Sequence, residues 1–313
     1  MAYQRQPVCL VDAPIKAANK SRHVFCNGVL VPVFWLISQL SLHIVKRRTS
    51  CVLLFAAEKE HCYPNAMNPL FSFRSHKDLT LLVYTPWWQQ GIVHGMTTNE
   101  LRFRDEALDA DAARLGQATG CEHVALLNQT HSDTVQDMRS IQLIQPLLDR
   151  YGDLTKRVEG DAWLFSREPS QSKAVLAWGI LTADCVPVVI RGRSGWGVVH
   201  AGWRGLANKI IEKVVIALGG AHEAAVFAAA GAPLYEVGLE VISAIGPSAV
   251  VYSVSESGQK VALDTAATAI RQLQAVAPSI SAEKASLCTL ADARFHSFRR
   301  DGQQVGRCVT FVA

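Results

Sequence analysis

The chain has 313 residues, of which 49% are apolar and 19% are charged, and its formal net charge is +4. A chain of this length and apolar content can bury a substantial core, which excludes intrinsic disorder for most of it. Its eight cysteines follow no regular spacing. This pattern excludes a small disulfide-stapled scaffold and indicates reduced thiols, so we expect a cytoplasmic protein.

The excess of positive charge is confined to the N-terminal segment. Residues 1–66 contain eight Lys and Arg against three acidic residues, whereas the other 247 residues contain 23 bases and 24 acids. The main body therefore lacks the positive field that attracts nucleic-acid phosphates. We expect no nucleic-acid partner.

The N-terminal segment also contains a mostly apolar run of 22 residues, Val24–Val45, which is about the length that crosses a bilayer. Asn27, Pro32, Gln39 and His43 interrupt this run. Basic residues flank both of its ends, which gives no orientation signal, and no small-residue cleavage site follows it. The run is therefore a weak candidate for a membrane span and a poor signal peptide.

Three interpretations of residues 1–66 stay open: a membrane anchor, an extra packed element and a dispensable extension. We favour the extension, which is disordered, membrane-proximal or the product of a mis-assigned start, with Met67 as the working start. The predicted division is an N-terminal extension (1–66) followed by a catalytic domain (67–313).

From about residue 80 the chain has the alternating pattern of a single α/β domain. A helix that is apolar on one face is predicted at Leu206–Leu218, stopped by Gly219-Gly220, and Asp264 is placed to cap a second helix that carries Ala267, Ile270, Leu273 and Val276 on one face. A short helix is predicted at Ala107–Leu115 and a hairpin loop at Arg191–Gly195. The remaining predicted elements are β-prone runs or strands: Leu81–Tyr84, Gly91–Met96, Val124–Leu127, Ala174–Leu181, Val186–Ile190, Trp196–His200 and Gln304–Val312.

Three ligand-type residues stand where apolar runs end in polar or glycine-rich turns. Cys185 and His200 lie at corresponding ends of the two runs that the hairpin joins, so pairing of these runs brings the two side chains together. His131, in the turn 128–133, would supply a third ligand. Three protein ligands leave the fourth position of zinc open, as in catalytic zinc sites. The alternatives are a core cysteine and a hydrogen-bonded histidine, because no short signature such as HExxH or CxxC is present.

Cationic groups are available for an anion near this site. The segment 200–205 leads into the predicted helix, so the free N–H groups of a helix start at Gly205, together with Arg204, would stabilise an anion beside the metal. His296, Arg299 and Arg307 lie near the C-terminus. The alternative for these arginines is a solvated surface patch.

Eight short motifs follow one another from residue 128 to residue 307: NQTHSD (128–133), GDAWL (160–164), LTADCVPV (181–188), VVHAGWRGL (198–206), AIGPSA (244–249), CT (288–289), FHSFRRDG (295–302) and VGR (305–307). In this order they resemble the YfiH-like family, which has been called multicopper polyphenol oxidase or laccase and also purine nucleoside phosphorylase with adenosine deaminase activity. The resemblance covers about three quarters of the chain, and ADC-x-P and HAGWRG are its most specific parts.

The resemblance implies an α+β fold, layered, with mixed β-sheets flanked by helices in a single domain. It implies a metal, zinc or alternatively copper, held by His131, Cys185 and His200. It also implies phosphorolysis of adenosine, inosine, guanosine and methylthioadenosine and hydrolytic deamination of adenosine, so the expected partners are a small nucleoside and phosphate. The sequence does not predict an oligomeric state.

Further roles are assigned within these motifs. Asp184 and Asp133 are candidates for acid–base catalysis because the His-x-Glu of the common zinc deaminases is absent. Arg204 is assigned to both catalysis and anion binding. The residues assigned to substrate or phosphate binding are Gln129, Arg204, His296, Arg299 and Arg307.

Three other functions stay open. Polyphenol oxidation with copper is disfavoured, because ten histidines without a His-x-His pair do not supply a trinuclear copper centre. Alternatively, Cys185 could be a nucleophile with His200 as its base, acting on an amide or thioester. The third alternative is a degenerate, non-catalytic member whose metal only holds the turns together.

The chain departs from the family pattern in two places. Asn99 stands where the family has an arginine, and Glu100–Asp111 replaces a Gly-Gly turn and the segment after it, in a region that ordinarily contributes to the substrate pocket. Tyr252–Ser255 follows the GPS turn where the family has Tyr-Glu-Val-Gly. Tyr235–Gly238 has that sequence but precedes the turn, so we assign it no role.

Overall fold

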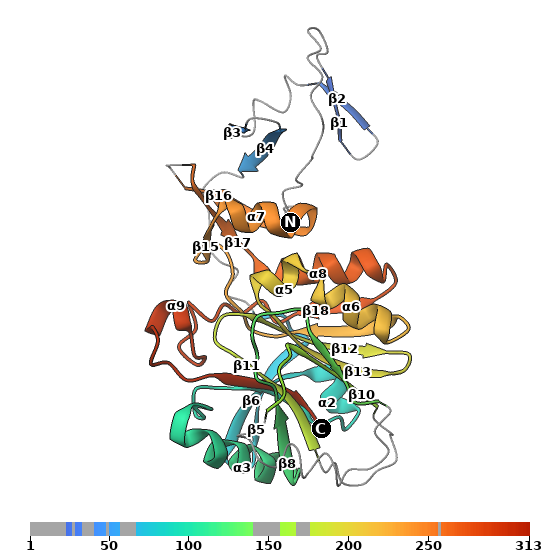
Figure 1. Ribbon diagram of the computed structural model, residues 1–313, viewed down its shortest axis with the longest axis vertical. Coiled ribbons are helices and arrows are strands. Elements are labelled where there is room, and N and C mark those ends of the chain that lie inside the picture. Colours follow the sequence, from blue (N-terminus) through green and yellow to red (C-terminus); the bar gives the residue numbers. More distant parts are fainter. Residues whose placement is uncertain are drawn as a thin grey trace.

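The computed structural model describes residues 67–139, 157–166, 176–255 and 258–313, together with the backbone of four N-terminal strands. These four strands form two antiparallel hairpins (Figure 1): β1 (His23–Cys26) with β2 (Val29–Pro32), and β3 (Ser41–Arg47) with β4 (Ser50–Ala56). Strands thus occupy the described parts of Val24–Val45. In the described part of the chain no helix is both long and apolar enough to cross a bilayer. The prediction that residues 1–66 are an extension otherwise lies outside the described residues.

Two six-stranded sheets form the body of the protein, and both are mixed, as predicted. In the first sheet β11 runs parallel to β8, and the other pairs are antiparallel. Its strands, in spatial order, are β5 (Phe71–His76), β6 (Leu79–Tyr84), β7 (His94–Thr97), β19 (Cys308–Val312), β11 (Leu176–Thr182) and β8 (His123–Leu126).

The second sheet has parallel pairs at both edges and antiparallel pairs between them. Its strands, in spatial order, are β18 (Ser281–Lys284), β14 (Ala221–Val226), β12 (Val186–Gly192), β13 (Gly195–Ala201), β10 (Ala162–Phe165) and β9 (Val135–Asp137). A smaller antiparallel sheet contains β15 (Glu236–Gly238), β17 (Lys260–Leu263) and β16 (Val251–Val254).

The two large sheets pack against each other through one face each. Successive side chains of a strand point to opposite faces. On β12, Val189 belongs to the core between the sheets, whereas Val188 and Ile190 belong to the core under the helices. On β19, Cys308 faces the other sheet and Phe311 faces away from it. Near-continuous apolar strands are the sequence signature of sheets covered on both faces.

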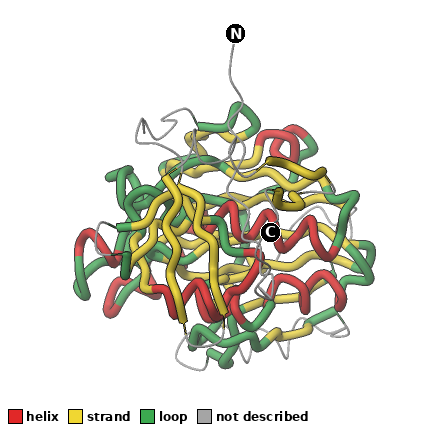
Figure 2. The backbone as a smooth tube through the Cα atoms, turned by 90° about the horizontal axis from the view of Figure 1, so that it is seen from above, coloured by secondary structure: helices red, strands yellow, loops and turns green. Residues whose placement is uncertain are grey.

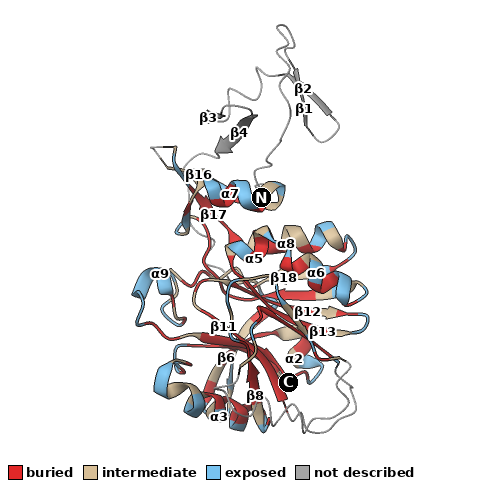
Figure 3. Ribbon diagram, in the orientation of Figure 1, coloured by how far each residue is buried: buried red, intermediate tan, exposed pale blue. Residues whose placement is uncertain are grey.

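Helices cover the two outer faces and complete four layers (Figure 1). The helix α3 (Leu108–Thr119) packs on the first sheet, and the following helices pack on the second: α5 (Trp203–Ala207), α6 (Ile210–Ala217) and α8 (Thr265–Val276). The helix α7 (Leu239–Ile245) packs against α5 and against β15 of the smaller sheet. Figure 2, turned by 90°, shows the helices and strands as one body, and Figure 3 shows that burial is concentrated in the sheets. Shorter helices are α2 (Thr85–Gln89), α9 (Phe298–Asp301) and the 3₁₀ turns Asp105–Ala107 and Gly246–Ser248.

The predicted hairpin and cap are confirmed, but the hairpin loop is shorter than the predicted Arg191–Gly195, because β12 extends to Gly192 and β13 begins at Gly195. β12 and β13 pair from Val186↔Ala201 to Gly192↔Gly195, which aligns the start of one strand with the end of the other. The Asp264 side chain accepts a hydrogen bond from the Ala267 N–H at the start of α8, an interaction of about 1 kcal/mol.

The predicted helix Leu206–Leu218 is wrong as a single element. It begins earlier, at Trp203, and it divides into α5 and α6 at Lys209, whose φ of +61° breaks the helical path. Because α5 has only five residues and starts before Gly205, the predicted anion site at a helix start at Gly205 is also incorrect. The apolar spacing still predicts burial, because Leu206, Ile210 and Val214 join the same core.

Candidate metal centre

Three ligand-type side chains, far apart in sequence, meet at one place. His131 follows β8 of the first sheet, His200 lies on β13 of the second, and Cys185 lies in the turn that carries the chain from β11 to β12. One ligand atom from each residue, an imidazole nitrogen or the Cys185 Sγ, lies within 4.8 Å of the other two. The predicted convergence of these three residues is therefore present in the structure.

The backbone beside the three side chains leaves little space. The ring centroids of His131 and His200 are 4.9 Å apart, with the ring planes at 77°. A Cβ at Gly202 would lie 3.0 Å from His131 Cδ2 and 3.3 Å from Cys185 Sγ. A side chain at position 202 would therefore press on both ligand side chains and require them to move by a few tenths of an ångström, which gives a physical reason for the glycine in the motif 200–205.

Asp161 lies directly behind this cluster and is fully buried. Its Oδ1 lies 2.7 Å from His200 Nδ1 and accepts a 3.1 Å hydrogen bond from the His131 backbone N–H. Its Oδ2 accepts hydrogen bonds from the Ser132 N–H and Oγ at 2.7 and 2.6 Å. The carboxylate thus contacts two of the three ligand residues.

The electrostatics favour a thiolate and an imidazolium in the metal-free chain. Burial raises the pKa of Cys185, but the charge of His200 and hydrogen bonds from His131 and His200 outweigh it and lower the pKa to about 6. Burial lowers the pKa of His200, but Cys185 and Asp161 raise it to about 9. The pKa of Asp161 falls to about 2, because hydrogen bonds from His200 and Ser132 outweigh the effect of burial.

The donor set fits a borderline-soft transition metal. One thiolate and two imidazoles are ligands that zinc and copper both accept, and three of them leave a coordination position open. His200 is buried, Cys185 is half-buried and His131 is exposed, so the open side of the cluster faces solvent. Within the described residues this is the one group of three such ligands. The geometry does not distinguish zinc from copper.

Asp184, the residue before Cys185, is buried and has a φ of +92°. Its Oδ1 accepts a 2.6 Å hydrogen bond from Thr289 Oγ1, and its Oδ2 accepts a 2.7 Å bond from the Arg299 N–H. His131, on the other side of the cluster, also has a positive φ, of +59°. One ligand residue, His131, and the residue before another, Asp184, thus have strained backbones. The cost is about 1–3 kcal/mol each, and the surrounding contacts must offset it.

Two other predicted residues make structural contacts. The Gln129 side chain donates to the Leu181 carbonyl and accepts from the Leu181 N–H, both at 2.7 Å, which ties the His131 loop to the end of β11. The Asp133 carboxylate pairs with Lys213 on α6, and this contact lowers its pKa. Their predicted roles in binding and catalysis stay predictions.

The predicted cationic residues differ in position. Arg204 is exposed and lies over the Trp203 ring, 4.3 Å from its centroid. His296 Nε2 lies 2.8 Å from the Leu101 carbonyl oxygen, and burial lowers the pKa of this histidine. Arg307 is half-buried; burial lowers its pKa, and the charges of Cys185 and Asp184 oppose this shift. Arg307 is therefore electrostatically coupled to the ligand turn.

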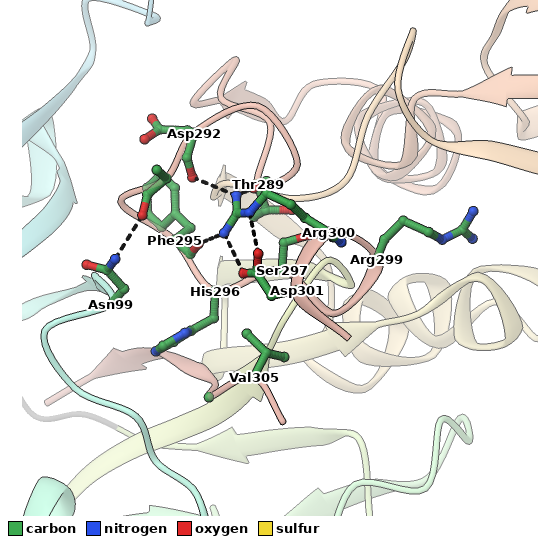
Figure 4. A network of polar contacts seen from close by, with 12 residues as sticks. Asn99, Thr289, Asp292, Phe295, His296, Ser297, Arg299, Arg300, Asp301 and Val305 are labelled. Atoms are coloured by element: carbon green, nitrogen blue, oxygen red, sulfur yellow. Dashed lines mark hydrogen bonds and ion pairs between the residues drawn. The ribbon is translucent and has the colours of Figure 1, made fainter. Parts of the chain in front are cut away.

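Arg299 connects the ligand turn to Tyr235. Its guanidinium lies 4.9 Å from the centroid of the Tyr235 ring and donates a 3.1 Å hydrogen bond to the Glu236 carbonyl. Burial, followed by the charge of Cys185, raises the pKa of Tyr235. In Figure 4 the Arg299 side chain points away from the neighbouring Arg300.

Arg300 organises the segment that carries Thr289 and Arg299. Its guanidinium donates to the carbonyls of Thr289 and Phe295 at 2.6 and 2.8 Å and pairs with Asp301 (Figure 4). These bonds fix the loop from which Thr289 contacts Asp184.

The part of the chain that holds the three ligands matches a known protein family. A family model described as "Multi-copper polyphenol oxidoreductase laccase" matches residues 99–313, which include all three ligands. The chain belongs to this family. The predicted membership of the YfiH-like family is thereby confirmed, and so is the mixed α+β fold.

Curated relatives in the family carry one name. A protein of Xylella fastidiosa (strain Temecula1), named purine nucleoside phosphorylase, is 40% identical over 143 residues, which are 42% of this chain and 55% of that protein. A protein of Aquifex aeolicus with the same name is 32% identical over 194 residues, 60% of this chain and 82% of that protein. The chain spans just over half of the length of the Xylella protein.

Solved structures of the family have the same fold. YlmD from Geobacillus stearothermophilus superposes with a TM-score of 0.65 at 22% identity, over 77% of this chain and 98% of that chain. The Bacillus licheniformis hypothetical protein YfiH gives a TM-score of 0.63 at the same identity, with the same coverage of both chains.

The structure describes both places where the chain departs from the family pattern. The Asn99 side chain donates a 2.8 Å hydrogen bond to the Ala293 carbonyl (Figure 4), so it fastens the loop instead of offering a charge. Of the two tyrosine segments, Tyr235 is the one beside the site. Tyr252 is 41% exposed, and burial, followed by the charge of Asp264, raises its pKa, with no contribution from Cys185. The structure therefore brings Tyr235, to which the sequence assigns no role, close to the site.

Sequence reasoning missed Asp161, Tyr235 and Thr289 as members of the site. Asp161 stands within GDAWL, a motif used only for the resemblance, and the signal was an acid directly before a wholly apolar strand. A buried carboxylate at such a position requires partners. For Thr289 no comparable signal exists, because a threonine after a cysteine is common in any loop.

Proposed function

We propose that the chain is a zinc-dependent purine nucleoside phosphorylase that also deaminates adenosine. The observation that carries the proposal is the convergence of His131, Cys185 and His200 on one open site, with Arg299 and Arg307 coupled to the same turn. The names of the curated relatives support the reaction class. The expected substrates are adenosine, inosine, guanosine and methylthioadenosine with phosphate.

In this proposal His131, Cys185 and His200 hold the zinc, which when bound supplies a Lewis acid with one open position. Phosphorolysis forms a bond between a phosphate oxygen and C1′ of the ribose and breaks the C1′–N9 bond of the purine. Arg299 and Arg307 supply positive charge for the phosphate, and the fixed guanidinium geometry suits its oxygens.

The two acidic residues that are candidates for proton transfer differ in their surroundings, and we choose between them on that basis. Asp184 adjoins Cys185 and is buried, so we retain it as the residue that exchanges a proton with the purine. Asp133 pairs with Lys213 at the surface, which makes it the weaker candidate. The contact of the Tyr235 ring with Arg299 supports a role for this tyrosine in nucleoside binding.

The test combines metal analysis with a nucleoside panel. We expect about one zinc per chain and release of free base from the four nucleosides only when phosphate is present, plus inosine from adenosine, measured by chromatography. Cys185→Ala should lose the metal and lower turnover more than about 100-fold, because loss of a mere outer-shell partner already costs 10–100-fold.

Cys121→Ala is the matched control for that variant. Cys121 is a buried cysteine outside the site and belongs to the core around α3, so this variant should keep both metal and turnover. If metal-loaded protein releases neither free base nor inosine, the proposed reaction is wrong. Metal without turnover would then favour the non-catalytic alternative.

One observation favours a second candidate, a cysteine hydrolase acting on an amide or thioester. Cys185, His200 and Asp161 form a thiol–imidazole–carboxylate series, the arrangement that activates a nucleophilic cysteine. This reading requires a free thiolate, whereas a metal occupies the sulfur. Protein that is metal-free as purified and is labelled by iodoacetamide at Cys185 would favour the hydrolase over the phosphorylase.

Copper-dependent polyphenol oxidation is the activity in the description of the family model. A single three-ligand group, as found in the described residues, suits electron transfer better than oxygen reduction at a trinuclear centre. Oxygen consumption with a phenolic substrate by copper-loaded protein would restore this alternative.

A further inference from the structure

The backbone places Asp161 opposite His200 before any side chain is considered. β10 and β13 pair antiparallel with Ala162 opposite Val199, so the preceding residue of β10 meets the following residue of β13. The His200 N–H donates a 2.7 Å hydrogen bond to the Asp161 carbonyl. The two residues are therefore held in register by the sheet itself.

The carboxylate then defines which nitrogen of His200 is free. Two N–H groups and one hydroxyl already donate to the Asp161 carboxylate, which therefore acts as an acceptor, so the proton between Asp161 Oδ1 and His200 Nδ1 belongs to the ring nitrogen. This leaves Nε2 as the atom that faces Cys185 and a cation. A ring held through its other nitrogen loses little freedom when it binds a metal.

The same carboxylate holds the turn of the second histidine. His131 adopts a left-handed conformation, which costs an L-residue about 1–2 kcal/mol. The N–H groups of His131 and Ser132 both donate to Asp161, and the Ser132 hydroxyl adds a third donor. With His200 Nδ1, four donors surround one fully buried side chain.

We propose that Asp161 is the positioning residue of the metal site: its carboxylate simultaneously orients the His200 ring and holds the His131 turn, so that both imidazoles face the Cys185 sulfur before a cation arrives. The inference rests on the metal site of the proposed function but does not depend on which reaction follows. It assigns Asp161 no contact with metal or substrate.

Asp161→Asn tests this role with nearly unchanged volume. An amide places an NH₂ donor against at least one of the N–H or O–H donors that now surround the carboxylate. We expect zinc affinity, measured by competition with a chromophoric chelator, to fall about 10- to 100-fold, as for other outer-shell partners. The visible spectrum of cobalt-substituted protein should shift, because the ligand geometry relaxes.

Two further variants separate positioning from general stability. Asp264→Asn removes another buried carboxylate, which caps α8 and pairs with Lys284 away from the site, and it should keep the wild-type zinc affinity and cobalt spectrum. Ser132→Ala removes one of the four donors and should give a smaller loss of affinity than Asp161→Asn. If Asp161→Asn does not fold, Ser132→Ala still provides the measurement.

The outcomes are distinct. Wild-type affinity and an unchanged cobalt spectrum in Asp161→Asn would overturn the proposal, as would an equal loss of affinity in Asp264→Asn or a wild-type chain that binds no zinc. Weak binding by Asp161→Asn alone supports it. Because the readout is metal affinity, this result stands even if the nucleoside panel shows no turnover, which would refute only the proposed reaction.

Discussion

Cys185 and His200 stabilise each other's charged forms in the metal-free chain, which makes the protonation of the sulfur the simplest property of the site to measure. Burial alone would keep the thiol neutral. The histidine charge and hydrogen bonds reverse that effect and lower the pKa of the thiol to about 6. At neutral pH the metal-free sulfur is therefore a thiolate.

We predict that metal-depleted protein reacts with iodoacetamide at Cys185 at a rate that rises with pH around 6 and is constant above about pH 7. The sign follows from the lowered pKa of the thiol: below pH 6 the sulfur takes up a proton and stops reacting. Mass spectrometry of the labelled peptide across pH measures this midpoint. A midpoint near that of an ordinary thiol, about 8.5, would contradict the ion pair. Zinc-loaded protein, the control, should be protected.

The three ligand residues could be predicted from the sequence, but Asp161, which contacts two of them, could not. Cys185 and His200 stand at aligned ends of a hairpin whose pairing follows from two apolar runs and a short glycine-containing loop. Asp161 approaches from a strand that is remote in sequence, and its register with β13 depends on the assembled sheet. Local patterns do not encode that register.

The break between α5 and α6 shows where periodicity is an incomplete guide. Apolar residues recur at helical spacing from Leu206 through Ile210 to Val214, and these three side chains are buried. The backbone nevertheless leaves the helical path at Lys209, where φ is +61°. Burial of a face and continuity of a helix are separate properties, and only the first leaves a pattern in the sequence.

We predict that Lys209→Gly stabilises the protein by up to about 1 kcal/mol, because glycine adopts a positive φ without the steric cost of a Cβ. The measurement is the midpoint of urea unfolding. Ala113→Gly, at an exposed position inside α3, is the control and should destabilise by about 0.5–1 kcal/mol. Equal destabilisation by both variants would mean that Lys209 is not strained.

All residues of the described core lie within 67–313, in three clusters: one between the sheets and one under each helical layer. The alternation of apolar runs and amphipathic stretches predicts a single domain of helices and strands, and the family resemblance supplies its layered class. The sequence could not predict the strand orders, in which β19, the last strand, inserts between β7 and β11. Such long-range pairing is a property of the whole chain.

We predict that a chain beginning at Met67 folds with a melting temperature within a few degrees of the full chain and keeps the same zinc affinity. The reason is that the described cores and the three ligands are all contained in it. Thermal denaturation and chelator competition on both chains measure this. A shorter chain that aggregates or loses zinc would show that residues 1–66 belong to the folded unit.

The turn that carries the chain from β11 to β12 also joins the two sheets, and its consequence extends beyond the cation. The His131 turn is held by Gln129 on the side of the first sheet and by Asp161 on the side of the second, His200 is part of the second sheet, and Cys185 lies at the junction. A bound ion would then cross-link the two sheets. Any slippage of one layer over the other would spread the three donors, so affinity for the ion would report on interlayer alignment long before the protein melts.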